Sequence, residues 1–243
     1  MRRSYWNTGQ NYSQPDTVQL QKNARMTAKK EKQKGKVLQP VVLKGRKIVN
    51  SWWGQAWCDN LEKYADYESR LERGKRYVRT GAVVDLKIQK GKVLARVQGR
   101  RKTPYKVEIR ISPLSEERCQ TAIEKCGRRI DNLERLLKGD FTEDLKDLFT
   151  STDGLFPRPQ EISFQCSCPD WALMCKHVAA VLYGIGSRFD EDPLLFFELR
   201  GIDVGRFVDI TIENRIESML DNADAKSERI IQDSDWEELS GVF

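Results

Sequence analysis

The strongest constraint on how this chain can fold lies in twelve residues, 166–177 (CSCPDWALMCKH), which hold three of its six cysteines and its only histidine. Cys166 and Cys168 are one residue apart, and Cys175 and His177 repeat that spacing. Side chains at i and i+2 point to nearly opposite sides of a helix, whereas they share a face in extended backbone. Each pair can therefore converge only outside a helix, and the Pro-Asp step after the first pair favours a turn that brings the two pairs together.

Three thiols and one imidazole form a ligand set that suits tetrahedral Zn²⁺. Because protein would fill all four positions, none is open to water, and the set predicts one structural zinc rather than a hydrolytic site. A Cys/His dyad usually draws its imidazole from a distant position and needs a third, orienting group. Redox pairs of the thioredoxin type use Cys-x-x-Cys, which this chain lacks. Four unconnected core residues are the remaining alternative.

The clearest strand pattern runs through residues 81–112 (GAVVDLKIQKGKVLARVQGRRKTPYKVEIRIS). Apolar and polar residues alternate in three segments, which predicts a three-stranded antiparallel meander. A short strand (EISFQC) is expected just before the metal motif. A basic sheet face can follow a phosphate backbone, although one solvated face is what any half-buried antiparallel sheet shows. The polar face would carry Lys87, Arg96, Lys106 and Arg110, and the second turn would carry Arg100, Arg101 and Lys102.

Helical spacing of apolar residues predicts the other elements. Asn50 or Ser51 can cap a first helix, whose apolar stripe holds three tryptophans and continues to Leu71. Such tryptophans more often anchor a core than form a base-stacking platform, so the core interpretation is favoured. A second helix over 112–139 places two cysteines on its buried face, and shorter helices are expected over 142–149, 176–189, 190–202 and 212–223. Those two cysteines are Cys119 and Cys126, and Cys58 in the first helix is likewise expected to be a small core residue.

The segment 166–183 (CSCPDWALMCKHVAAVLY) resembles the SWIM zinc finger, which occurs in bacterial proteins, SWI/SNF-type ATPases and Mutator-type transposases. The segments SWWGQAW, GAVVDLKI, GKVLARVQG and PYKVEI are similar to bacterial SWIM-finger proteins that accompany a SWI/SNF-type helicase. The spacer between the two ligand pairs is short for the family, but no ligand is missing. The resemblance implies DNA binding or protein interaction without catalysis, and it implies the zinc ligands Cys166, Cys168, Cys175 and His177.

These patterns together predict an α+β fold. A basic antiparallel β-meander with flanking helices would be followed by a small SWIM zinc-finger subdomain and a helical, acidic C-terminal region. The expected organisation is a flexible basic arm (1–47), an α+β domain with the meander and a long helix (48–150), the SWIM zinc finger (151–190), and a helical extension with an acidic tail (191–243). The sequence leaves open whether residues 50–150 and 151–220 pack as one domain or two.

Charge is strongly segregated along the chain. Residues 1–130 carry 31 Lys/Arg against 12 Asp/Glu, a net charge of +19, while the remainder carries 11 against 24, a net charge of −13. A basic half of this kind suits an anionic partner, with nucleic acid the first candidate, although a solvated surface with a charged tail would show the same pattern. The predicted nucleic-acid contacts are Lys29, Lys30, Lys87, Arg96, Arg100, Arg101, Lys102 and Lys106.

The sequence therefore predicts a zinc-binding, non-enzymatic accessory protein that binds nucleic acid, with DNA the first candidate, through its basic N-terminal half. A protein-interaction adaptor that docks a SWI/SNF-type helicase through its acidic C-terminal half is the alternative. An enzyme is disfavoured, since the chain has no phosphate-binding Gly-rich loop and no evident pair of catalytic carboxylates. No apolar run approaches the roughly 18 residues of a membrane-spanning helix, and clustered cysteines suit a reducing cytoplasm.

Overall fold

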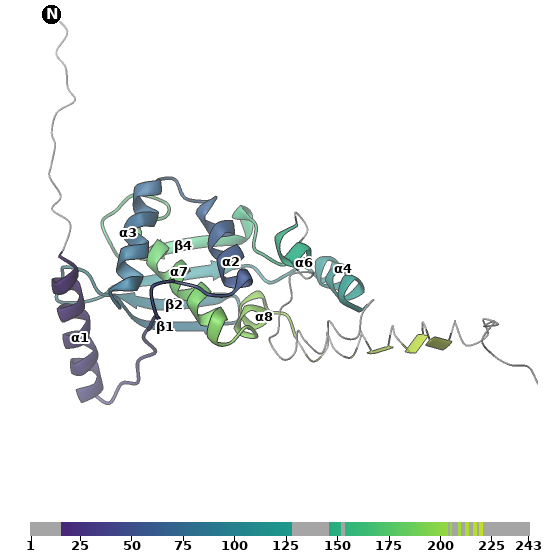
Figure 1. The fold of residues 1–243 in the computed structure, drawn as a ribbon, viewed down its shortest axis with the longest axis horizontal. Coiled ribbons are helices and arrows are strands. Elements are labelled where there is room, and N and C mark those ends of the chain that lie inside the picture. The colour runs from purple at the N-terminus through teal and green to yellow at the C-terminus, as the bar shows by residue number, and fades with distance from the viewer. Residues whose placement is uncertain are drawn as a thin grey trace, which may run out of the picture.

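The structure is a computed structural model, which describes residues 16–127, 146–151 and 154–203, with isolated helical positions between 205 and 220. The ordered elements combine helices with one sheet (Figure 1). In chain order they are α1 (Thr17–Gln33), α2 (Trp52–Glu62), α3 (Glu68–Arg79), β1 (Val83–Gln89), β2 (Lys92–Val97), β3 (Tyr105–Ile111), α4 (Glu116–Gly127), α6 (Lys146–Thr150), a 3-10 turn (Pro159–Glu161), β4 (Ile162–Cys166), α7 (Lys176–Glu191) and α8 (Leu195–Arg200).

The sheet has four antiparallel strands in the order β1-β2-β3-β4. Its first three strands are the predicted meander, which is confirmed. Cross-strand register runs from Leu86 to Ala95, Val107 and Cys166, so that a zinc ligand ends a row of apolar residues. The strand that leads into the metal motif, β4, completes the sheet, and the segments around it share one continuous hydrophobic core with the meander.

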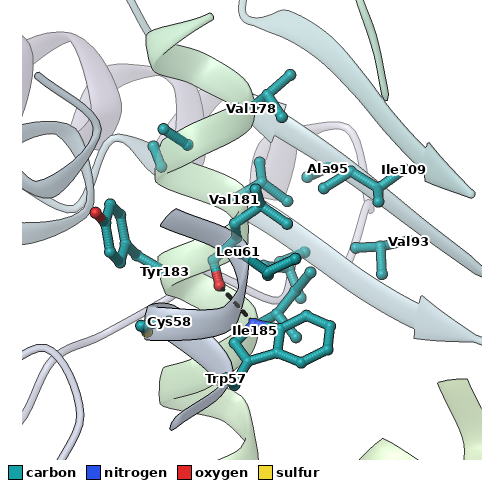
Figure 2. Close-up of a cluster of buried hydrophobic side chains, with 14 of the residues drawn as sticks. Trp57, Cys58, Leu61, Val93, Ala95, Ile109, Val178, Val181, Tyr183 and Ile185 are labelled. Atoms are coloured by element: carbon teal, nitrogen blue, oxygen red, sulfur yellow. Dashed lines mark hydrogen bonds between the residues drawn. The ribbon is translucent and has the colours of Figure 1, made fainter. Parts of the chain in front are cut away.

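Helix α7 lies across the apolar face of the sheet and is flanked by α2 and α3 (Figure 1). Its residues are apolar on nearly every side, as suits a helix that is covered all round. Trp57 of α2 is 0% exposed, and its indole Nε1 donates a hydrogen bond to the Leu182 carbonyl of α7 at 3.1 Å (Figure 2). The tryptophan cluster therefore anchors the core, as the sequence predicted, and does not form an exposed stacking platform.

Helices α3 and α7 approach each other closely because small residues meet where they cross. A Cβ atom on Gly74 would lie 2.5 Å from the Cβ of Ala179, a separation that real Cβ atoms essentially never show. Gly186 has a milder effect toward α2, since a Cβ there would lie 3.0 Å from the Sγ of Cys58, a tight contact that a small shift could relieve. The close packing of the three helices over the sheet therefore depends most on Gly74.

The flexible arm expected for residues 1–47 is wrong from residue 16 onward; residues 1–15 lie outside the described part. Residues Thr17–Gln33 form α1, whose Leu20 is 0% exposed in the core. Beyond the helix, the chain continues beside β1, where the Leu86 amide donates to the Gln39 carbonyl at 2.8 Å. The sequence analysis did not predict this helix because most of its residues are polar, and its buried residues Leu20 and Ala24 form too short an apolar pattern.

Helix α1 is tied to the sheet by the side chain of Arg96. Its guanidinium lies 2.9 Å from Glu31 of α1 and 3.1 Å from Asp85 of β1. The same arginine lowers the pKa of the Glu31 carboxyl through a hydrogen bond. Thr27 adds a hydroxyl hydrogen bond of 2.8 Å to Gln98. The arm thus becomes part of the folded domain through polar contacts that a linear pattern does not display.

Several helix boundaries differ from the predicted ones. The tryptophan stripe is divided between α2, capped by Ser51, and α3, so Leu71 belongs to a second helix. Helix α4 begins at Glu116 and is described to Gly127, with Cys119 half-buried against the core as expected. The side chain of Cys126, the rest of the predicted 112–139 helix, and most of the acidic C-terminal region lie outside the described residues. Within the described residues, no helix is both long and apolar enough to cross a membrane.

We predict that Gly74→Ala destabilises the protein by about 1–3 kcal/mol, because overpacking at the α3–α7 crossing outweighs the helix propensity that alanine gains over glycine. Chemical denaturation would measure the free energy of unfolding. Ser69→Ala, at an exposed position of the same helix, is the control and should change stability by less than about 0.5 kcal/mol. Equal stability of Gly74→Ala and the native protein would contradict the close packing described above.

Candidate metal centre

Four ligand atoms meet where β4 ends and α7 begins. Cys166 is the last residue of β4 and Cys168 follows in the loop, while Cys175 is the N-cap residue of α7 and His177 lies in its first turn. Their sulfur and nitrogen atoms all lie within 4.8 Å of one another, and Cys166 Sγ is 3.8 Å from His177 Nδ1. The predicted convergence of the two pairs is therefore what the structure shows.

The loop between the two pairs is held by α3 and by the connection that precedes it. The carboxylate of Asp66 accepts hydrogen bonds from the backbone amides of Leu173 and Met174, at 2.8 and 3.3 Å. Arg70 forms an ion pair of 3.1 Å with Asp170, and both side chains are largely buried. These contacts fix the turn that returns Cys175 to the first pair, and they come from residues about a hundred positions away in sequence.

The electrostatics of the four side chains suit a metal. Burial lowers the pKa of His177, so its imidazole is neutral and one nitrogen lone pair can bind a cation. Hydrogen bonds from the thiols of Cys166 and Cys175 lower the pKa of Cys168, which favours its thiolate. By contrast, burial raises the pKa of the Cys58 thiol, which stays protonated in the core. Within the cluster, the hydrogen bonds with Cys168 and Cys175 raise the pKa of Cys166, and the pKa of Cys175 is raised as well. The cluster thus favours one thiolate, and a metal would displace the protons of the other two thiols.

The residues present fit one structural zinc. Zinc ligands at about 2.3 Å for sulfur and 2.0 Å for nitrogen, placed tetrahedrally, lie roughly 3.5–3.8 Å from one another, close to the 3.8 Å between Cys166 and His177. Cys166, Cys168, Cys175 and His177 would hold the ion and fill its shell. Bound zinc would supply a cross-link between the end of β4 and the start of α7, which is a stabilising role.

Aromatic rings surround the histidine ligand. The ring of Tyr105 stacks on His177 with centroids 4.2 Å apart and planes 24° apart, and Tyr77 meets it edge-on at 5.3 Å. A Cβ on Gly99 would lie 2.7 Å from the Tyr105 ring, so this glycine makes room for the stack. Burial raises the pKa of Tyr77 to about 12, although the positive charges of Arg100 and Arg73 act in the opposite direction. Two arginines therefore lie near the metal centre.

The predicted nucleic-acid residues fall into three groups. Lys29 and Lys30 are exposed on α1, Lys87 and Lys106 are exposed on the polar face of the sheet, and Arg100, Arg101 and Lys102 are exposed on the β2–β3 turn. Arg96 differs, because its guanidinium is engaged by Asp85 and Glu31. Lys106 and the turn residues lie beside the finger, since the Lys106 amide donates to Ser167 Oγ at 2.9 Å and a Cβ on Gly99 would lie 3.7 Å from His177 Nε2. Lys87 lies farther away, on β1 at the opposite edge of the sheet.

The sequence analysis missed Asp66, Arg70, Tyr77 and Tyr105, the residues that support the ligands. Tyr105 had a usable signal: it lies two positions before Val107, which pairs with Cys166 in the sheet. The guanidinium of Arg101 lies over the Tyr105 ring, 5.3 Å from its centroid. No short motif marks the other three, because they come from the connection and helix that precede the sheet.

Comparison with known proteins agrees with this geometry. Residues 165–184 match the family model of the SWIM zinc finger, a span that includes all four ligands. The chain therefore carries a SWIM zinc finger, as the motif predicted. It is also similar to the uncharacterized protein Rv2102 of Mycobacterium tuberculosis (strain ATCC 25618 / H37Rv), with 36% identity over 156 residues. That alignment covers 63% of this chain and 56% of the relative, so the chain spans little more than half of the relative's length. No solved structure matches the chain significantly.

We predict that Cys168→Ser lowers zinc affinity by more than about 100-fold, since loss of a direct ligand should exceed the 10–100-fold cost of losing an outer-shell partner. Metal analysis of the purified protein should give one equivalent of zinc for the native chain and less than half for the variant. Cys119→Ser is the matched control, because this cysteine lies outside the ligand cluster. Full zinc retention by Cys168→Ser, measured against a chelator, would exclude the assigned ligand set.

Proposed function

We propose that this protein is a non-enzymatic accessory factor that binds the phosphate backbone of DNA through a basic surface, with the zinc finger as a structural support. The observation that carries the proposal is the cationic polar face of the sheet, opposite the face that α7 covers. Lys87 and Lys106 are exposed there, and neither forms an ion pair with any residue that the structure describes. Lysines of this kind contact phosphates with little regard to base sequence.

The carboxylates on this face of β1 and β3 are already paired. Asp85 is engaged by Arg96 at 3.1 Å, and Glu108 is engaged by Arg110 at 2.6 Å. These internal pairs leave the charge of Lys87 and Lys106 uncompensated by the strands that carry them. A surface that retains positive charge after internal pairing attracts a polyanion, and the attraction weakens as salt screens it.

The β2–β3 turn extends the basic surface at one end of the sheet. Its backbone is fixed by Gln98, whose side-chain amide donates to the carbonyls of Gly99 at 3.0 Å and Arg101 at 2.6 Å. Asn23 of α1 donates to the same Gly99 carbonyl at 3.3 Å. The turn therefore presents Arg100, Arg101 and Lys102 from an ordered backbone, which reduces the entropy lost on binding.

The chemistry of the finger supports a structural role. All four coordination positions would be filled by side chains, so bound zinc would offer no site for water or substrate. A metal held in this way stabilises the loop between β4 and α7, and with it the backbone beside Lys106. The proposal is accordingly one of binding without catalysis.

The alternative function is an adaptor that docks a SWI/SNF-type helicase through the acidic C-terminal region. The tail that motivates it, within residues 221–243, lies outside the described residues. Docking of a helicase therefore stays a prediction of the sequence, and the cationic sheet face favours nucleic acid as the primary partner.

We predict that the double variant Lys87→Glu/Lys106→Glu weakens duplex DNA binding by at least about tenfold at low salt and reduces the slope of log affinity against log salt by about 2. Fluorescence anisotropy with a labelled duplex, titrated from low to physiological salt, would measure both quantities. Parallel titrations with RNA of the same sequence would show whether DNA is preferred.

The control is Lys63→Glu/Lys146→Glu, which alters net charge equally at exposed positions at the end of α2 and on α6. This control should bind within about twofold of the native protein, because its lysines lie on α6 and at the end of α2, helices that contact each other, and α2 packs against α7. An equal loss in both variants would mean that net charge alone matters, and native binding that is absent or insensitive to salt would refute the proposed function.

A further inference from the structure

Two large apolar side chains of the finger loop point into solvent. Trp171 is 79% exposed and Leu173 is 65% exposed, whereas Ala172 and Met174, which alternate with them, are buried. Tyr67, in the connection between α2 and α3, meets the indole edge-on with ring centroids 5.5 Å apart. This single ring contact supports Trp171 and leaves most of the indole surface open to a ligand.

The loop that carries Trp171 is held in place on both sides. Ligands Cys168 and Cys175 fix its two ends. Asp66 accepts two of its backbone amides, and the Arg70–Asp170 ion pair fixes the residue immediately before Trp171. The exposed indole is therefore presented from an ordered backbone, and a flat ring that contacts it would lose little of its binding energy to ordering the loop.

The carboxylates around the indole are mostly engaged within the protein. Both oxygens of Asp66 accept backbone hydrogen bonds, and Asp170 is paired with Arg70. Asp66 and Glu68 are both exposed beside the start of α3. The charge of Asp170 is therefore compensated by a cation, whereas Asp66 and Glu68 form no ion pair with a residue that the structure describes.

Arginines continue from the indole toward the basic turn. Arg70 contacts Asp170 and Tyr77 contacts His177, so one side of α3 faces the finger. Arg73 lies on this side, one helical turn from each of them. Arg100 and Arg73 both act electrostatically on Tyr77, the first from the β2–β3 turn and the second from α3. Arg101 follows over Tyr105. The metal centre is thus bordered by a series of cations with an exposed tryptophan at one end.

We propose that this border is a binding site for single-stranded DNA, in which a base stacks on Trp171 and the phosphate backbone follows Arg73, Arg100 and Arg101. The assignment rests on the proposed function and adds the form of nucleic acid that the site prefers. Bases in a duplex are stacked on one another and offer no free face, whereas a single strand can place one on an exposed indole. Base–aromatic stacking of this kind tolerates any base.

The test compares a labelled oligothymidylate with a duplex of the same length, by fluorescence anisotropy on the full chain. Trp171→Ala should weaken single-strand binding by about tenfold and change duplex binding by less than twofold, while Trp171→Phe should retain part of the affinity because it keeps an aromatic face. Zinc content and circular dichroism of each variant should match the native protein, since the side chain removed is largely exposed.

Leu173→Ala is the matched control, because it removes an exposed apolar side chain from the same loop without removing an aromatic face. An equal loss in Leu173→Ala and Trp171→Ala would overturn stacking, since leucine offers no aromatic ring. Native protein that binds duplex with salt dependence, together with a Trp171→Ala variant unchanged toward the single strand, would overturn this inference and leave the proposed function standing. Native protein that binds neither form would refute both.

Discussion

Burial of helix α7 between the sheet and helices α2 and α3 is the constraint on which the rest of the structure depends. The helix is apolar on nearly all sides, and it packs closely because Gly74, and to a lesser extent Gly186, leaves room for its neighbours. Its N-terminus carries Cys175 and His177, so the packing that forms the core also fixes half of the ligand set. The other half ends a strand of the sheet against which α7 packs. The metal centre is therefore a consequence of how helix and sheet meet, not a separate module attached to them.

The same arrangement connects the metal centre to the basic turn. His177 is covered by Tyr105, and Tyr105 is covered in turn by the guanidinium of Arg101. Because each group packs on the next, zinc bound to His177 would also restrain Tyr105, and Tyr105 would in turn restrain Arg101. Gln98 and α1 restrain the turn from its opposite side. Arg101, one of the cations proposed to contact DNA, thus depends on the finger for its placement.

The zinc ligands and the meander could be predicted from sequence because each depends on local spacing. The i, i+2 separation defines the ligand pairs, and alternation over 81–112 defines three strands whose order the structure reproduces. Helix α1 could not be predicted in that way, since its polar surface conceals Leu20 and its attachment depends on Arg96, sixty-five positions from Glu31. The residues that support the finger loop, Asp66 and Arg70, were not predicted for the same reason. Long-range polar contacts produce no periodic pattern in the sequence, and they attach α1 and the finger loop to the sheet and to α3.

A metal-held loop also explains how Trp171 can be both exposed and ordered. A loop fixed by its own hydrophobic contacts must turn its large side chains inward, because burial of apolar area is what stabilises it. Here Met174 is buried, while the ligands, Asp66 and Arg70 supply the remaining restraint through coordination and polar contacts. The loop is consequently free to direct Trp171 and Leu173 outward. Zinc would therefore contribute to the proposed binding without touching the nucleic acid, because it would allow an apolar surface to face solvent on a backbone that does not need that surface for its own stability.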